Sequence, residues 1–168
     1  SIVTNIPNSA FKGASFLESA TLASSVVSIG ESAFENCRDF SSLQAGSFSS
    51  LGKRAFYECS KLKSVSLKNG ITEIPDEAFC NCGALKTINI PDTVTTIGNK
   101  AFSQATSLTK IELPDGIKTI GDEAFFNCES VTSLYIGKDI VSIGTKAFAG
   151  VDGVSMVEIG KYIQTINR

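Results

Sequence analysis

The five cysteines are the first residues to consider as reactive groups, because a thiolate is both a nucleophile and a metal ligand. Cys80 and Cys82 form a Cys-x-Cys pair, which is half of a common metal-binding pattern. The chain contains no histidine, which removes Ser-His and Cys-His nucleophilic sites and the commonest zinc ligand. Alternate residues of an extended backbone also point apart. We therefore expect no metal and no cofactor.

Acidic residues are the second group that could carry chemistry. Asp122 and Glu123 are adjacent, and paired carboxylates can act as general acid and base. We place them on an exposed turn, which lacks the desolvation that tunes catalytic carboxyls. Asp92 and Asp115 each follow a proline, a turn signature that supplies too few oxygens for calcium. We expect no catalytic residue and no enzyme.

These residues lie within a repeated unit that is marked by an Ala-Phe pair. Five of the six intervals between pairs are 23 residues, and the interval from Ala33 to Ala55 is 22. Such a period predicts a solenoid that forms a single domain over residues 1–168, and the incomplete first and last units indicate a piece of a longer protein. About seven units start near Ile6, Ile29, Leu51, Ile74, Ile97, Ile120 and Ile143.

The pattern inside the unit predicts its local structure, counting the starting Ile or Leu as position 1. Positions 15 and 17 are apolar and positions 14 and 16 are mostly polar, which predicts a strand around positions 13 to 17 in a parallel sheet. A second short extended piece is expected around positions 21 to 1. Position 3 favours Asn, Asp and Thr, so we expect a helical or 3₁₀ turn to carry Ala-Phe. The predicted class is an α/β repeat solenoid.

Two further positions predict how the units stack. Position 9 holds Cys37, Cys59, Cys82 and Cys128 where other units have alanine or valine, so we expect buried thiols beside stacked phenylalanines. An odd cysteine count is not a disulfide framework. Charges at positions 3 and 4 alternate in sign from unit to unit, which predicts a ladder of opposite charges along one edge.

The full unit, Ile-Gly-x-x-Ala-Phe-x-x-Cys-x-x-Leu-x-x-Ile-x-Ile-Pro-x-x-Val-x-x, resembles the BspA-like leucine-rich repeat. Residues 74–96 and 97–119 carry it most clearly, and residues 38–50 depart from it. The resemblance implies a curved leucine-rich-repeat solenoid with its sheet on the concave face, on surface or secreted proteins. It also implies adhesins that bind host matrix or cell-surface proteins, and it transfers no catalytic residue.

Outward strand positions are mostly small and polar, and the exceptions lie toward the C-terminal end. We expect the protein-binding patch there, and its candidates are Lys110, Glu112, Tyr135, Met156 and Glu158. The leading hypothesis is a non-catalytic protein-binding or adhesion module that uses the concave face. The alternative is a structural protein that self-assembles end to end. A net charge of −2 and the lack of a basic stripe or long apolar run argue against nucleic acid binding and membrane insertion.

Overall fold

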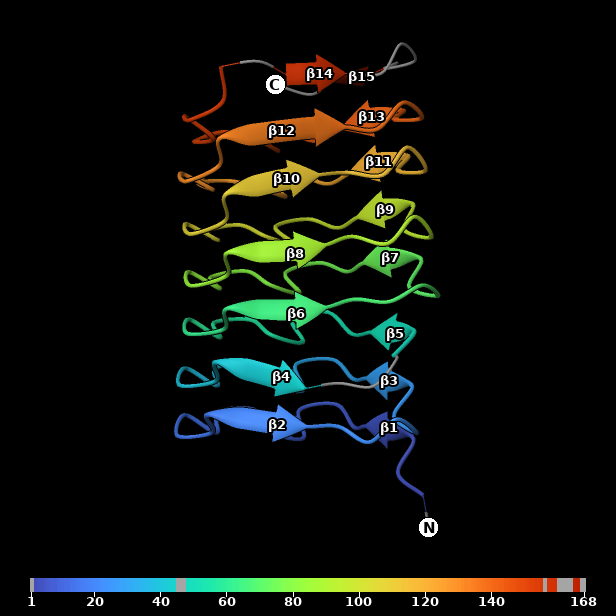
Figure 1. Cartoon of the computed structure of the whole chain (residues 1–168), viewed down its shortest axis with the longest axis vertical. Coiled ribbons are helices and arrows are strands. Elements are labelled where there is room, and N and C mark those ends of the chain that lie inside the picture. The colour runs from blue at the N-terminus through green and yellow to red at the C-terminus, as the bar shows by residue number, and fades with distance from the viewer. Residues whose placement is uncertain (1, 45–47, 156, 160–164, 167–168) are drawn as a thin grey trace.

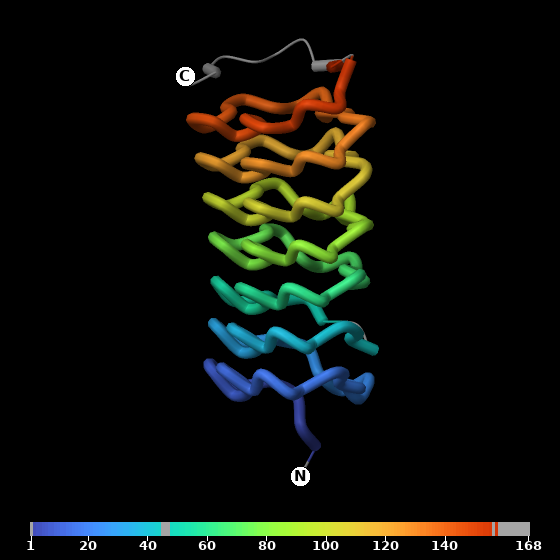
Figure 2. Tube along the Cα trace, turned by 90° about the vertical axis from the view of Figure 1, so that its left-hand side faces the viewer, coloured from blue at the N-terminus to red at the C-terminus, as the bar shows by residue number. Residues whose placement is uncertain are grey.

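The computed structural model describes residues 2–44, 48–155, 157–159 and 165–166, and they form a column of stacked turns (Figure 1). One stack contains β2 (Ser19–Thr21), β4 (Ser42–Gln44), β6 (Ser64–Ser66), β8 (Thr87–Asn89), β10 (Lys110–Glu112), β12 (Ser133–Ile136) and β14 (Val157–Ile159). The other contains β1 (Asn5–Ile6), β3 (Ser28–Ile29), β5 (Ser50–Leu51), β7 (Glu73–Ile74), β9 (Thr96–Ile97), β11 (Thr119–Ile120), β13 (Ser142–Ile143) and β15 (Thr165–Ile166). Seen from the side, each unit is one coil laid on the preceding coil (Figure 2).

Strand register follows the repeat. Where strands of successive units pair, they run parallel and join equivalent positions, so that Lys110 lies opposite Ser133 and Ser19 opposite Ser42. In the 22-residue unit Ile29 still pairs with Leu51. Phe48, two residues before β5, is buried there. The unit that is one residue shorter therefore keeps its strands in register, and its apolar side chains still point into the core.

The two expected strands per unit are confirmed, but neither stack forms one continuous hydrogen-bonded sheet. The short strands divide into β1-β3-β5 and β15-β13-β11-β9-β7. At other steps the position-2 glycine donates its N–H to the preceding unit, as Gly98 does to Ile74 O at 2.7 Å. Pro75 occupies this position after β7 and has no N–H to donate to Leu51. The sheet divides at that step. The longer strands form the groups β2-β4, β6-β8 and β10-β12-β14.

The segment that carries Ala-Phe is a run of turns. The prediction of a helical or 3₁₀ turn there is therefore wrong for the described residues. In the part of the chain that the structure describes, twelve non-glycine residues have positive φ, and all occupy position 4 or 8 of a unit. Left-handed residues at this spacing interrupt any right-handed helix. The N–H groups alternate in direction: Phe34 N donates to Ala55 O of the next unit, and Glu35 N donates to Ser32 O within its own turn. The class is therefore a parallel β-solenoid.

Position 3 links units instead of capping a helix. Asp76 Oδ1 accepts a hydrogen bond from Asn99 N at 2.9 Å, and Asn99 Oδ1 accepts one from Asp122 N at 2.8 Å. The same oxygen-to-amide link joins Asn8 to Glu31 and Asp122 to Thr145. Asn and Asp are therefore favoured here because their short side chains reach the next backbone.

Among the described residues, the predicted ladder of opposite charges is present as three ion pairs at two of the steps between units. Lys53 Nζ lies 2.8 Å from Asp76 Oδ2, and Arg54 Nε lies 3.8 Å from Glu77 Oε2. Two units further on, Lys100 Nζ lies 3.6 Å from Glu123 Oε2. These pairs are partly exposed, so they favour stacking in register and contribute little to stability individually.

Asp76 gives a prediction for acid stability. The hydrogen bond from Lys53 and the amide of Asn99 hold the pKa of Asp76 below its ordinary value of 3.8. The unfolded chain therefore takes up this proton first as the pH falls, and the stabilisation present above pH 3.8 is lost below it. We expect Asp76→Asn to lose less stability than the wild type between neutral pH and about pH 3, measured by urea unfolding.

The asparagine variant keeps a side-chain oxygen that can accept the hydrogen bond from Asn99 N. The comparison of Asp76→Asn with the wild type therefore tests only the negative charge of Asp76. Asp152→Asn, at an exposed position, is the matched control. An unchanged acid sensitivity in Asp76→Asn, or an equal change in the control, would contradict this assignment.

Phenylalanine rings form the predicted ladder through the middle of the column. Successive position-6 rings stack with centroids 5.1 to 5.4 Å apart. The rings belong to Phe11, Phe34, Phe56, Phe79, Phe102, Phe125 and Phe148. Five of these are fully buried, whereas Phe11 in the first unit is 40% exposed.

The cysteine thiols beside the phenylalanine rings also form hydrogen bonds between units: Cys59 Sγ donates to Phe34 O at 3.1 Å, and Cys82 Sγ donates to Phe56 O at 3.1 Å.

Candidate functional site

The outward side chains of β6, β8, β10 and β12 form a surface that we call the strand face. Three candidate residues lie on it: Lys110 and Glu112 on β10, and Tyr135 on β12. Backbone register places Glu112 opposite Tyr135, and Tyr135 opposite Glu158 of β14. The structure thus brings these three positions into one cross-strand row. Met156 lies outside the described residues.

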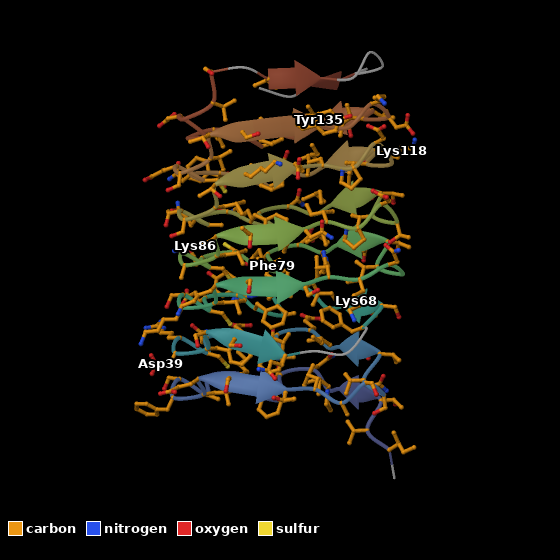
Figure 3. All side chains as sticks on the ribbon, viewed as in Figure 1. Asp39, Lys68, Phe79, Lys86, Lys118 and Tyr135 are labelled. Atoms are coloured by element: carbon orange, nitrogen blue, oxygen red, sulfur yellow. The ribbon has the colours of Figure 1, made fainter. Side chains whose placement is uncertain are left out.

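Tyr135 is fixed in place by the loop that follows β10. Its hydroxyl donates to Asp115 Oδ1 at 2.7 Å, and Lys138 Nζ donates to Asp115 Oδ2 at 3.0 Å. The Tyr135 hydroxyl and the Lys138 ammonium hold the pKa of Asp115 below its usual range. The half-buried Tyr135 ring is therefore held at the surface before any partner arrives (Figure 3).

A shallow groove of about 380 Å³ lies next to the row, over β6, β8 and β10. Its lining consists of Ser64, Val65, Ser66, Thr87, Ile88, Asn89, Lys110 and Glu112. Lys110 Nζ lies 2.6 Å from Glu112 Oε1, so an ion pair forms one wall. The sequence candidates therefore occupy the C-terminal margin of the groove. The sequence analysis missed the groove itself, although runs of small residues at positions 14 and 16 beside larger charged ones were a visible signal.

The cysteines are free and buried, and their surroundings suppress thiolate chemistry. Burial raises the pKa of Cys80 to about 11 and that of Cys128 to about 12. Burial also raises the pKa of Cys82, the other half of the Cys-x-Cys pair. The four position-9 thiols use their protons in bonds to the carbonyls of preceding phenylalanines. They behave as small core residues that also hydrogen-bond between units.

Two further tests concern metals and membranes. No group of three or more potential metal-ligating residues occurs in the part of the chain that the structure describes. Over the same residues, we find no helix with the length and apolar character that a membrane span requires.

Known proteins share both the repeat and the architecture. The model of the "BspA type Leucine rich repeat region" matches residues 1–108 and 72–168. A leucine-rich cell surface protein of Faecalibacterium prausnitzii is 30% identical, with a TM-score of 0.88 over 94% of this chain and 43% of its own. The Treponema pallidum leucine-rich repeat protein is 27% identical, with a TM-score of 0.83 over 90% of this chain and 72% of its own. A search of curated proteins gives no match.

The chain therefore spans less than half the length of the Faecalibacterium protein. A leucine-rich repeat protein of Bacteroides ovatus, 22% identical with a TM-score of 0.63, shares the fold over 94% of this chain and 57% of its own. The family match extends over both halves of the sequence, including the departing residues 38–50. The repeated unit, the solenoid fold and the match to the family model all indicate the same family. This chain belongs to the BspA-type leucine-rich repeat family, whose members commonly act in binding.

Proposed function

We propose that this chain is a non-catalytic protein-binding module of a cell-surface or secreted protein, and that it binds through the strand face. The observation that carries the proposal is the anchored Tyr135, whose ring is held by Asp115 beside the Lys110–Glu112 ion pair. A rigid aromatic next to charged groups is typical of the residues that dominate protein interfaces. The similarity to a protein described as a leucine-rich cell surface protein supports the location.

Adhesion to a host matrix or cell-surface protein is the specific role that we propose. Tyr135 loses little conformational entropy on binding, because its hydroxyl is already fixed. The adjacent groove adds hydrogen-bonding groups at the rim of the patch. A partner would therefore contact an aromatic centre with polar groups around it.

The test is binding of purified extracellular matrix proteins to the immobilised chain, measured by surface plasmon resonance. Tyr135→Ala removes both the ring and its hydrogen bond to Asp115, and we expect about tenfold weaker binding or more. Tyr57→Ala is the matched control, because Tyr57 lies on a turn away from the strand face, under Arg54. Equal binding by wild type and Tyr135→Ala would remove Tyr135 as the anchor, and no binding by the wild type would contradict the matrix assignment.

End-to-end assembly is the second candidate, and one observation favours it. Large apolar side chains are exposed on the first unit, where Phe16 is 89%, Ile2 79% and Val3 60% exposed. Stacked rings and strands of one chain could continue into another. Light scattering over a dilution series distinguishes the candidates: particles that grow with concentration support assembly, and a constant monomer mass contradicts it.

A further inference from the structure

Three lysines from successive units meet at the start of the longer strands. Lys63 immediately precedes β6, Lys86 immediately precedes β8, and Lys110 is the first residue of β10. All three are exposed, and Figure 3 shows Lys86 at the N-terminal end of β8. We call this set the lysine edge. It was not recognised as a basic stripe in the sequence because its members are 23 and 24 residues apart.

Two members of the lysine edge, Lys63 and Lys86, carry positive charge that no described side chain neutralises. Lys86 N donates to Lys63 O at 3.1 Å, so the two residues occupy equivalent places in adjacent units. Like charges on directly neighbouring strands destabilise a sheet. Within the described part of the chain, neither ammonium group has a carboxylate partner.

Neighbouring charges on this side of the column are already compensated. Arg38 pairs with Glu58 at 3.0 Å, and Lys61 pairs with Asp39. Lys110 pairs with Glu112, the one acidic residue in the groove lining. The uncompensated charge of Lys63 and Lys86 is thus local, although the whole chain has a net charge of −2.

The groove beside the lysine edge offers unused hydrogen-bonding groups. Ser64, Ser66, Thr87 and Asn89 line it and are exposed, while Val65 and Ile88 form its floor. None of these four polar side chains has a hydrogen-bond partner among the residues that the structure describes. A row of hydroxyl and amide groups next to free ammonium groups complements a ligand that is rich in both hydroxyls and anionic groups.

We propose that the lysine edge and the groove bind an anionic oligosaccharide. Its carboxylate or sulfate groups contact Lys63 and Lys86, and its hydroxyls bond to the side chains of the groove. An acidic peptide fits less well, because the groove has no deep apolar pocket for side-chain anchors.

The experiment measures binding of three sugar probes and one peptide probe by isothermal titration calorimetry. The probes are heparin oligosaccharides, hyaluronan oligosaccharides, neutral dextran and poly-glutamate. We expect one or both anionic sugars to bind with an affinity that falls as salt rises, and dextran not to bind. Heparin and hyaluronan distinguish sulfate from carboxylate recognition.

A charge-matched pair of variants tests the location. We expect Lys63→Gln with Lys86→Gln to weaken anionic sugar binding about tenfold, because two charge contacts are lost. Lys118→Gln with Lys146→Gln removes the same charge elsewhere, and Lys118 lies on the short-strand side in Figure 3. This control should bind as the wild type does.

Three outcomes would overturn the proposal. If both double variants weakened sugar binding equally, the sugar would be attracted by the positive charge of the protein in general and not by the lysine edge. Poly-glutamate binding as tightly as the sugars would assign the site to acidic peptides. Binding by neither anionic sugar would leave the lysine edge without the proposed ligand. None of these outcomes bears on matrix-protein binding at Tyr135, which has its own variant and control.

Discussion

Phe79→Ala is expected to destabilise the protein by about 3–5 kcal/mol, the range for removing a fully buried aromatic ring. The Phe79 ring stacks on Phe56 at 5.4 Å and on Phe102 at 5.3 Å, and it is completely buried. The alanine leaves a cavity that interrupts the ladder on both sides. The backbone hydrogen bond that Phe79 N donates to Ala101 O limits how far the units can collapse into the cavity. Urea unfolding followed by circular dichroism measures the loss.

Phe16→Ala is the control for that experiment, because Phe16 is 89% exposed and lies outside the ladder. We expect its free energy of unfolding to stay within about 0.5 kcal/mol of the wild type. A comparable loss in the two variants would show that the ladder is not the main source of cohesion between units.

Gly121→Ala is the second large effect that we expect, with a loss of about 1–3 kcal/mol or more. A methyl group at Gly121 would lie 2.6 Å from Asn99 N and 2.7 Å from the carbonyl carbon of Gly98. Both are backbone atoms of the unit below, so the clash is relieved only if the units separate. Separation also lengthens the hydrogen bond from Gly121 N to Ile97 O, now 2.8 Å. Thermal and urea unfolding both detect the change.

Gly83→Ala tests whether that effect comes from contact between units and not from the substitution itself. The nearest atom to a methyl group there is Thr106 Oγ1, at an ordinary 3.6 Å. The alanine restricts the unfolded chain, so we expect no loss and a gain of up to about 1 kcal/mol. A stable Gly121→Ala protein would show that position 2 does not limit the spacing of the units.

The stacking core was predictable because its positions repeat by residue type. Phenylalanine at position 6 and cysteine, alanine or valine at position 9 recur in every unit, and this repetition of residue type indicates a buried position. The left-handed turns were not predictable, since Arg54 and Gln104 have no preference for positive φ, which costs such residues about 1–2 kcal/mol each. Their N–H groups donate to Asp76 O and Phe126 O of the next unit, and those bonds select the conformation. The residues that determine each left-handed turn therefore lie one repeat further along the chain.

The candidate site was predictable only in part, for a related reason. Tyr135 stood out as an aromatic residue at an outward strand position, and the structure places it there. Its partner Asp115 lies 20 residues earlier, in a loop whose course no strand pattern specifies. The groove depends on Ser64 and Thr87, which are individually unremarkable small residues. Only their stacking beside Lys110 gives them a common surface.

Pro75 has a mechanical consequence for a column of this kind. When such a protein is pulled along its axis, the load passes through the bonds that join consecutive units. At the step from Leu51 to Pro75 one of those bonds is missing, and the short strands change from one sheet to the next. We expect tension to open the column first on this side, between β5 and β7. The units on either side would then part as two intact blocks.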